Sequence, residues 1–68
     1  MERNDYIMLA QKYSIDKKTV VYFDSIGYYP IGYKMDFDHG TPVNKALLLD
    51  KNNNATIEVL ISKVVENL

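Results

Sequence analysis

Cysteine is absent from this chain of 68 residues, and histidine occurs only once, at position 39. Without cysteine the chain has no disulfide framework and no cysteine-based zinc site. One imidazole, His39, beside Asp36 and Asp38 is a poor set of metal ligands, and carboxylates in such a polar stretch more often cap a turn. We therefore expect no metal and no cofactor.

The signatures of catalysis are missing as well. The sequence shows no nucleophile paired with a base, no carboxylate pair placed for acid–base chemistry and no glycine-rich phosphate loop. A domain this small also has little room for an enclosed pocket. We expect a protein that is not an enzyme.

Long hydrophobic runs do not occur either. No stretch approaches the roughly 18 apolar residues of a membrane-spanning helix, and no signal-peptide pattern opens the chain. The expectation is a soluble, cytoplasmic protein without membrane contact.

Positive charge is not in surplus. Eight lysine and arginine residues against nine aspartate and glutamate residues give a formal net charge of −1. A nucleic-acid-binding protein normally shows a basic face, whereas here only Lys17 and Lys18 are adjacent basic residues. This counts against strong phosphate-driven binding by one chain, although a ring of subunits could still concentrate charge on one face.

Hydrophobic residues, by contrast, make up 47% of the chain, and six residues are tyrosine. That composition is typical of a folded domain, and we expect a single domain over residues 1–68. A chain of this length buries only about 60% of its unfolded surface, so it often gains stability by oligomerising.

The richest structural signal lies between residues 19 and 38. The β-branched and aromatic run 19–23 predicts a strand that stops at Asp24-Ser25. Gly27 is expected to supply the positive φ of the turn, and Gly32 the freedom to bend within the second strand. Pro30 lacks an N–H, so we expect it at a bulge or on an exposed edge.

The flanking segments follow simpler patterns. Residues 4–13 place apolar side chains at helical spacing behind Asn4 or Asp5 as a cap, and they predict a short helix that ends before residue 14. Residues 36–44 are polar and predict a loop. Residues 45–50 predict a strand, and the asparagine-rich residues 51–54 predict a turn.

The tail, residues 55–68, carries two patterns at once. A period of 3.6 gathers six apolar residues into a helical stripe, whereas six β-branched residues among the fourteen favour strands. Two strands that meet near Ser62-Lys63 are the preferred interpretation. The alternative is a small α+β domain that ends in a helix.

Taken in order, these segments resemble the Sm-like family, which includes bacterial Hfq. Gly27 and Gly32 stand five residues apart, and the pair Phe37-Asp38 follows after another five. Asn44 precedes an apolar strand as the family's asparagine does. The tail is similar to the family's second motif, in which two apolar pairs flank two small or charged residues: Leu60-Ile61, Ser62-Lys63 and Val64-Val65.

The resemblance implies a fold and a function. The fold is mainly β: a small, strongly bent, five-stranded Sm-like (SH3-like) barrel over residues 19–66, with an N-terminal helix over residues 4–13. The function is binding of single-stranded RNA by a homo-oligomeric ring through base stacking. The base contacts are then expected from Phe23, His39 and Asn44, and the phosphate contacts from Lys18, Lys34 and Lys63.

The chain also departs from the family. The loop between Asp38 and Asn44 is longer than usual, and Val59-Leu60 stand where Hfq proteins carry the Lys-His pair of their uridine-binding face. The missing pair implies a reduced uridine preference, which leaves base stacking to carry recognition.

Two other functions remain open from the sequence. Residues 9–23 are similar to a helix-turn-helix. Ala10, Ser14 and Val20 stand where that motif places an alanine, a turn residue and a packed apolar residue, and residues 17–19 would open the DNA-recognition helix. A small inhibitor or adaptor that docks on a protein partner through a tyrosine-rich surface is the third hypothesis, and the near-zero net charge fits it best.

Overall fold

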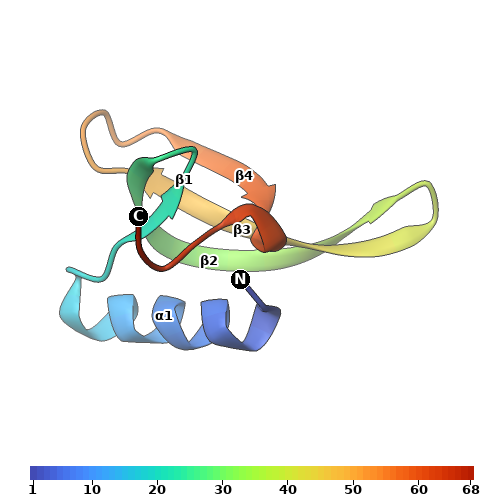
Figure 1. Ribbon diagram of the computed structural model, residues 1–68, viewed down its shortest axis with the longest axis horizontal. Helices are drawn as coiled ribbons and strands as arrows, with labels where there is room; N and C mark the ends of the chain where they lie inside the picture. The colour runs from blue at the N-terminus through green and yellow to red at the C-terminus, as the bar shows by residue number, and fades with distance from the viewer.

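The chain forms one N-terminal helix beneath a curled antiparallel sheet, as the computed structural model of all 68 residues shows (Figure 1). The sheet has four strands in the order β1-β2-β3-β4. The elements are α1 (Arg3–Asp16), β1 (Val21–Phe23), β2 (Ile26–Asp38), β3 (Thr41–Asp50), β4 (Thr56–Leu60) and a 3-10 turn, η1 (Ile61–Lys63). The predicted mainly β domain with an N-terminal helix is confirmed at this level.

Helix α1 is longer than the sequence predicts. Ser14 does not break it, because its Oγ donates a hydrogen bond to the carbonyl of Gln11 at 2.6 Å and so stays compatible with the helix. The helix ends instead at Asp16, and its C-cap, Lys17, has a left-handed backbone with a φ of 57°. The expected cap is also wrong, since the N-cap is Glu2 and makes no side-chain hydrogen bond.

The carboxylate of Asp16 organises the chain just after α1. It accepts hydrogen bonds from the N–H of Lys18 at 2.8 Å and of Thr19 at 3.1 Å. These bonds, with that from Lys18 contributing most, hold the pKa of Asp16 below its usual value.

The chain then enters β1, and no second α-helix follows Lys17. The helix-turn-helix interpretation is therefore wrong.

The strands are joined by tight turns in which polar residues adopt the left-handed conformation. Asp24 and Ser25, with φ of 51° and 65°, connect β1 to β2, as a two-residue hairpin of this type requires. The prediction that Gly27 provides the turn is therefore wrong. Gly27 lies within β2, opposite Tyr22. A Cβ at residue 27 would lie 3.1 Å from Cγ1 of Val20, so the glycine permits close approach of the chain entering β1.

The predicted loop over residues 36–44 is likewise wrong. Strands β2 and β3 run through it, and only His39 and Gly40, with φ of 50° and 80°, form the turn between Asp38 and Thr41. The polar residues of this segment suggested a loop, but it forms a hairpin whose two positive-φ residues are a histidine and a glycine.

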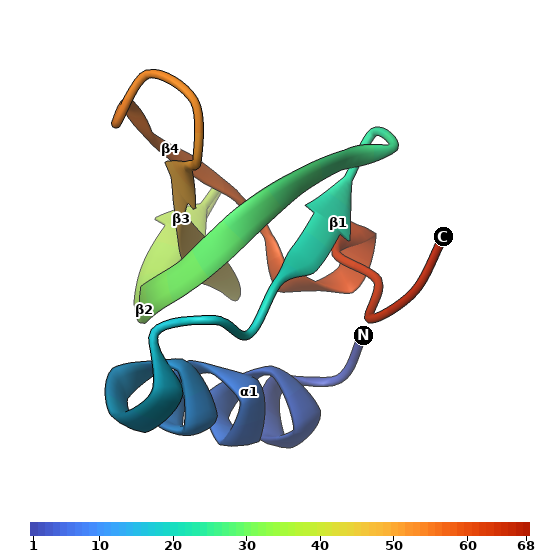
Figure 2. The ribbon, with the colours of Figure 1, turned by 90° about the vertical axis from the view of Figure 1, so that its left-hand side faces the viewer.

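A bulge interrupts the pairing of β2 with β3. Pro30 pairs with Leu48 and Gly32 with Leu47, so Ile31 is the extra residue on β2. Pro30 thus occupies the bulge at which its missing N–H costs no ladder bond. Above α1 the sheet curls into a half-barrel (Figure 2).

The core is small and draws on every long element. Its largest member, Tyr6 of α1, is fully buried and donates its hydroxyl to the carbonyl of Gly32 at 2.6 Å and of Leu47 at 3.1 Å. These bonds tie the helix to both strands at the bulge. The buried residues are Tyr6, Val21, Tyr28, Ala46, Leu48, Ile61 and Val64.

The tail is neither a helix nor two full strands. Strand β4 ends at Leu60 and is followed by the single turn η1, so the alternative of a C-terminal helix is wrong. Beyond η1, Val65 pairs with Tyr22 of β1 through two backbone hydrogen bonds of 2.9 Å. One bridge thus stands where the sequence predicts a fifth strand.

No helix of the structure has both the length and the apolar character that crossing a bilayer requires.

Candidate functional site

The β2–β3 hairpin extends beyond the rest of the sheet. Strand β1 covers β2 only as far as Tyr28, and β4 covers β3 only from Lys45 onward. The remaining residues, 35–44, form a two-stranded ribbon that projects from the body of the molecule and that we call the arm (Figure 1).

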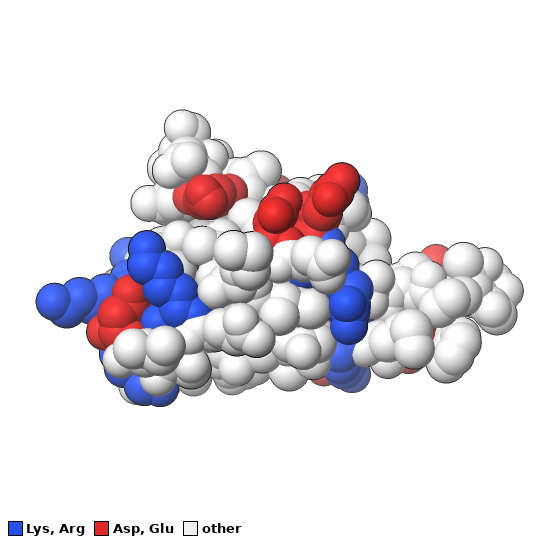
Figure 3. All heavy atoms as spheres, turned by 90° about the horizontal axis from the view of Figure 1, so that it is seen from below, with Lys and Arg blue, Asp and Glu red and all other residues white.

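One face of the arm and its base is apolar. Tyr33, Met35 and Phe37 alternate along β2 and are 44%, 62% and 66% exposed. Pro42 lies directly opposite Phe37, and directly opposed residues share a face. We call Tyr33, Met35, Phe37 and Pro42 the apolar face; Asn44, directly opposite Met35, is a polar residue on the same side of the arm. In Figure 3 this end of the molecule is almost free of charged atoms.

The other face is polar. Lys34 Nζ lies 3.1 Å from Glu58 Oε1, and Lys45 Nζ lies 3.7 Å from Asp36 Oδ2. The N–H of Phe37, followed by the charges of Lys45 and Lys34, keeps the pKa of Asp36 below its usual value. The arm is therefore amphipathic, with ion pairs on one face and large apolar side chains on the other.

The residues predicted to bind RNA do not form one surface on a single chain. Phe23 is half-buried against the core at one end of β2, while His39, with its side chain 96% exposed, lies beyond the other end. Asn44 lies on the arm opposite Met35. Lys18 follows α1, Lys63 lies in η1, and Lys34 is on β2 and engaged with Glu58.

The basic side chains are dispersed, and half of them are engaged. Arg3 lies over the Tyr33 ring at 5.7 Å and Lys17 over the Tyr13 ring at 5.1 Å, and Lys34 and Lys45 are ion-paired. Figure 3, which views the molecule from the side of α1, accordingly shows separate basic patches rather than a continuous stripe. The remaining basic residues are Lys12, Lys18, Lys51 and Lys63.

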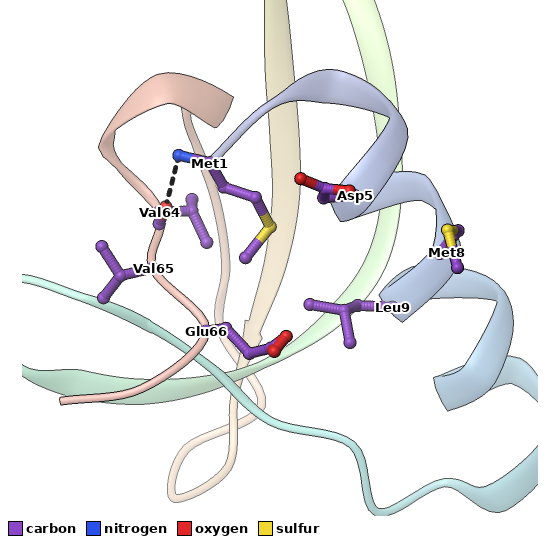
Figure 4. A pocket seen from close by; sticks show the side chains of 7 residues that line it. All are labelled: Met1, Asp5, Met8, Leu9, Val64, Val65 and Glu66. Atoms are coloured by element: carbon purple, nitrogen blue, oxygen red, sulfur yellow. Dashed lines mark hydrogen bonds between the residues drawn. The ribbon is translucent and has the colours of Figure 1, made fainter.

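A second surface feature is an open groove of about 360 Å³ between α1 and the C-terminal segment (Figure 4). Met8 and Leu9 line one side and Val65 the other, while Asp5 and Glu66 supply two carboxylates. The N-terminal amine donates to the carbonyl of Val64 at 2.9 Å and introduces a positive charge there.

Sequence reasoning missed both surfaces. The groove joins residues from the two ends of the chain, which no local pattern brings together. For the arm a signal was present: Tyr33, Met35 and Phe37 alternate with polar residues before the His39-Gly40 pair, as in a hairpin strand.

Comparison with known proteins adds nothing to this description, since no family model, no curated protein and no solved structure matches the chain.

Proposed function

We propose that this chain is a protein-interaction module that docks through the apolar face of the arm. The supporting observation is the exposure of Tyr33, Met35 and Phe37 in a row along β2, from the base of the arm onto the arm itself. Isolated exposed apolar residues such as Ile15 and Leu68 are ordinary, but a contiguous apolar patch marks an interaction site.

The chemistry of the face favours a protein partner over a nucleic acid. Tyrosine, methionine and phenylalanine are enriched in the buried centres of protein interfaces, where charged residues are depleted. The apolar face itself contains no charged residue, and the ion pairs of Lys34 and Lys45 lie on the opposite face. A polynucleotide would need a row of free cations beside the aromatic rings, whereas the cation over a ring of this face is the single Arg3, 5.7 Å from the Tyr33 ring.

Photocrosslinking tests the proposal directly. With p-benzoylphenylalanine in place of Phe37, irradiation of cells that carry the gene is expected to yield a covalent protein adduct. The same amino acid in place of Ile15, which is 85% exposed on α1, is the matched control and should yield several-fold less. Equal adducts at both positions, or none at position 37, would contradict docking through the arm.

A second candidate function is binding of single-stranded RNA by a homo-oligomeric ring of Sm-like barrels. It is favoured by the order of the elements, a helix, four antiparallel strands, η1 and the pairing of Val65 with Tyr22, which follows that of the five-stranded barrel. In this proposal Phe23, His39 and Asn44 contact bases. Lys18, Lys34 and Lys63 contact phosphates, which for Lys34 means leaving Glu58.

For this candidate we expect weak binding of A-rich RNA that disappears between about 50 and 200 mM salt, because each chain neutralises few phosphates. Filter binding with A-rich, U-rich and duplex competitors measures it. Phe23→Ala should weaken binding by removing a stacking ring, while Lys51→Ala, in a solvated turn, should not. Absence of binding at the lower salt concentration would remove the RNA proposal and leave the arm proposal intact.

A further inference from the structure

We infer that the groove between α1 and the C-terminal segment is a second docking site, which binds a basic segment of a partner protein through one large apolar side chain flanked by lysine or arginine. The groove shares no lining residue with the arm, so the inference does not depend on the proposed role of the arm. It follows from two properties of the groove, its apolar lining and the sign of its unpaired charges.

The lining of the groove is apolar and adaptable. Met8 and Val65 are 66% and 46% exposed, and the side chains of Met1 and Leu9 face the same space from opposite sides (Figure 4). Methionine side chains re-pack around apolar groups of different shape. At about 360 Å³ the groove is near the lower end of the roughly 300–1,000 Å³ of ligand-binding sites. Because it is open, it suits a side chain presented by a chain segment.

The charges of the groove select a cation. Asp5 of α1 and Glu66 of the tail both contribute a carboxylate (Figure 4), and neither carboxylate belongs to an ion pair within the chain. The amine of Met1 is the cation of the lining, and it already donates to the carbonyls of Val64 at 2.9 Å and Ser62 at 3.5 Å. Two unpaired carboxylates therefore face the occupant.

This combination identifies the chemistry of the occupant. An apolar groove accepts the apolar side chains of an amphipathic segment, and carboxylates beside the groove are complementary to basic residues next to that apolar side chain. The same carboxylates disfavour phosphate groups, and with them nucleic acid and the anionic surface of a membrane. A basic, apolar-anchored segment of a protein is the partner that satisfies both properties.

The size of the groove determines the strength to expect. Few apolar side chains are available for contact, and ion pairs between exposed groups add little. The contact is much smaller than the roughly 800 Å² per partner of a stable interface. We expect a Kd of roughly 0.1–1 mM for a short peptide. Binding should weaken several-fold between about 50 and 200 mM salt, because the charges are screened.

Three capped peptides of about ten residues provide the test. The first carries a central leucine between two lysines, the second has glutamate in place of both lysines, and the third has serine in place of the leucine. Each is titrated into protein labelled at the methionine methyl groups. With the first peptide the signals of Met1 and Met8, which line the groove, should shift, while that of Met35 on the arm should not. The other two peptides should bind about tenfold more weakly.

Variants of the chain then separate the lining from the charges. Met8→Gln should raise the Kd of the lysine peptide several-fold, whereas Ile15→Gln, which also removes an exposed apolar side chain from α1, should leave it unchanged. The double change Asp5→Asn and Glu66→Gln should abolish the preference for lysine over glutamate in the peptide. All four positions are exposed, so these variants should fold as the parent chain does, which circular dichroism checks.

Four results would overturn the inference. Unmoved Met1 and Met8 signals at millimolar lysine peptide would exclude this occupant. Equal binding of the lysine and glutamate peptides would exclude selection by the carboxylates. A shift of the Met35 signal alone would place the peptide on the arm. Met8 shifts that grow with protein concentration in the absence of peptide, together with an average mass above 7.9 kDa in sedimentation equilibrium, would mean that a second copy of the chain fills the groove.

Discussion

Replacing Tyr6 by alanine is expected to cost about 3–5 kcal/mol, the range seen when a large buried aromatic side chain is truncated. That loss approaches the whole stability of roughly 3–5 kcal/mol that a single small core supplies. Tyr6 is the largest fully buried side chain, and it fills the space between α1 and the bulge. We expect the variant to be largely unfolded at 37 °C by circular dichroism.

The conservative change Tyr6→Phe separates the ring from its hydroxyl. The ring still packs, but the hydrogen bonds to the carbonyls of Gly32 and Leu47 are lost, at a cost of about 1–3 kcal/mol because buried acceptors are left unpaired. Urea unfolding of both variants gives the two values. If the phenylalanine variant is as stable as the parent chain, the hydroxyl does not hold α1 to the bulge.

The same hydroxyl gives the chain a dependence on alkaline pH. Burial raises the pKa of Tyr6 far above its ordinary value. Because the folded-state pKa is the higher one, the stabilisation is fully present below about pH 10 and is lost as the pH rises further. The Tyr6→Phe variant retains the other five tyrosines. Its free energy of unfolding should therefore fall less steeply above about pH 10 than that of the parent chain.

Ending the chain at Lys63 should be almost as damaging as Tyr6→Ala. The truncation removes fully buried Val64, worth about 1.5–3 kcal/mol. It also removes both hydrogen bonds between Val65 and Tyr22, each worth about 0.5–1.5 kcal/mol. Thermal denaturation should show a broad transition at much lower temperature, or none.

The matched control for this truncation ends the chain at Glu66. It removes only Asn67 and the 78% exposed Leu68 and should melt within a few degrees of the full chain. Equal melting temperatures for the two truncations would mean that the bridge between Val65 and Tyr22 does not hold the half-barrel closed.

Parts of this fold follow from local chemistry and could be predicted. Pro30 had to avoid a ladder bond and lies at the bulge, and the asparagines after Lys51 form the expected turn. The β-branched residues before Asp24 form a strand, although it begins only at Val21.

Other parts depend on neighbours that a local pattern does not reveal. Ser14 looked like a helix terminator, but its hydroxyl satisfies the carbonyl of Gln11 within the helix. Asp24 adopts positive φ in the turn that Gly27 was expected to supply, and His39 does so within a segment predicted as a loop, because aspartate and histidine also tolerate this conformation. The arm is exposed because β1 and β4 stop short of it, and the lengths of those pairings are set by tertiary packing.

The connectivity of the half-barrel also determines the order in which the chain folds. The arm closes across two turn residues, His39 and Gly40, whereas Tyr22 must find Val65 forty-three positions further along. Distant pairings are entropically expensive and slow, and local hairpins form in microseconds. During synthesis Val65 leaves the ribosome last of these residues. The nascent hairpin therefore presents Met35 and Phe37 before the core can close, and neighbouring ribosomes on one messenger hold such hairpins at high local concentration.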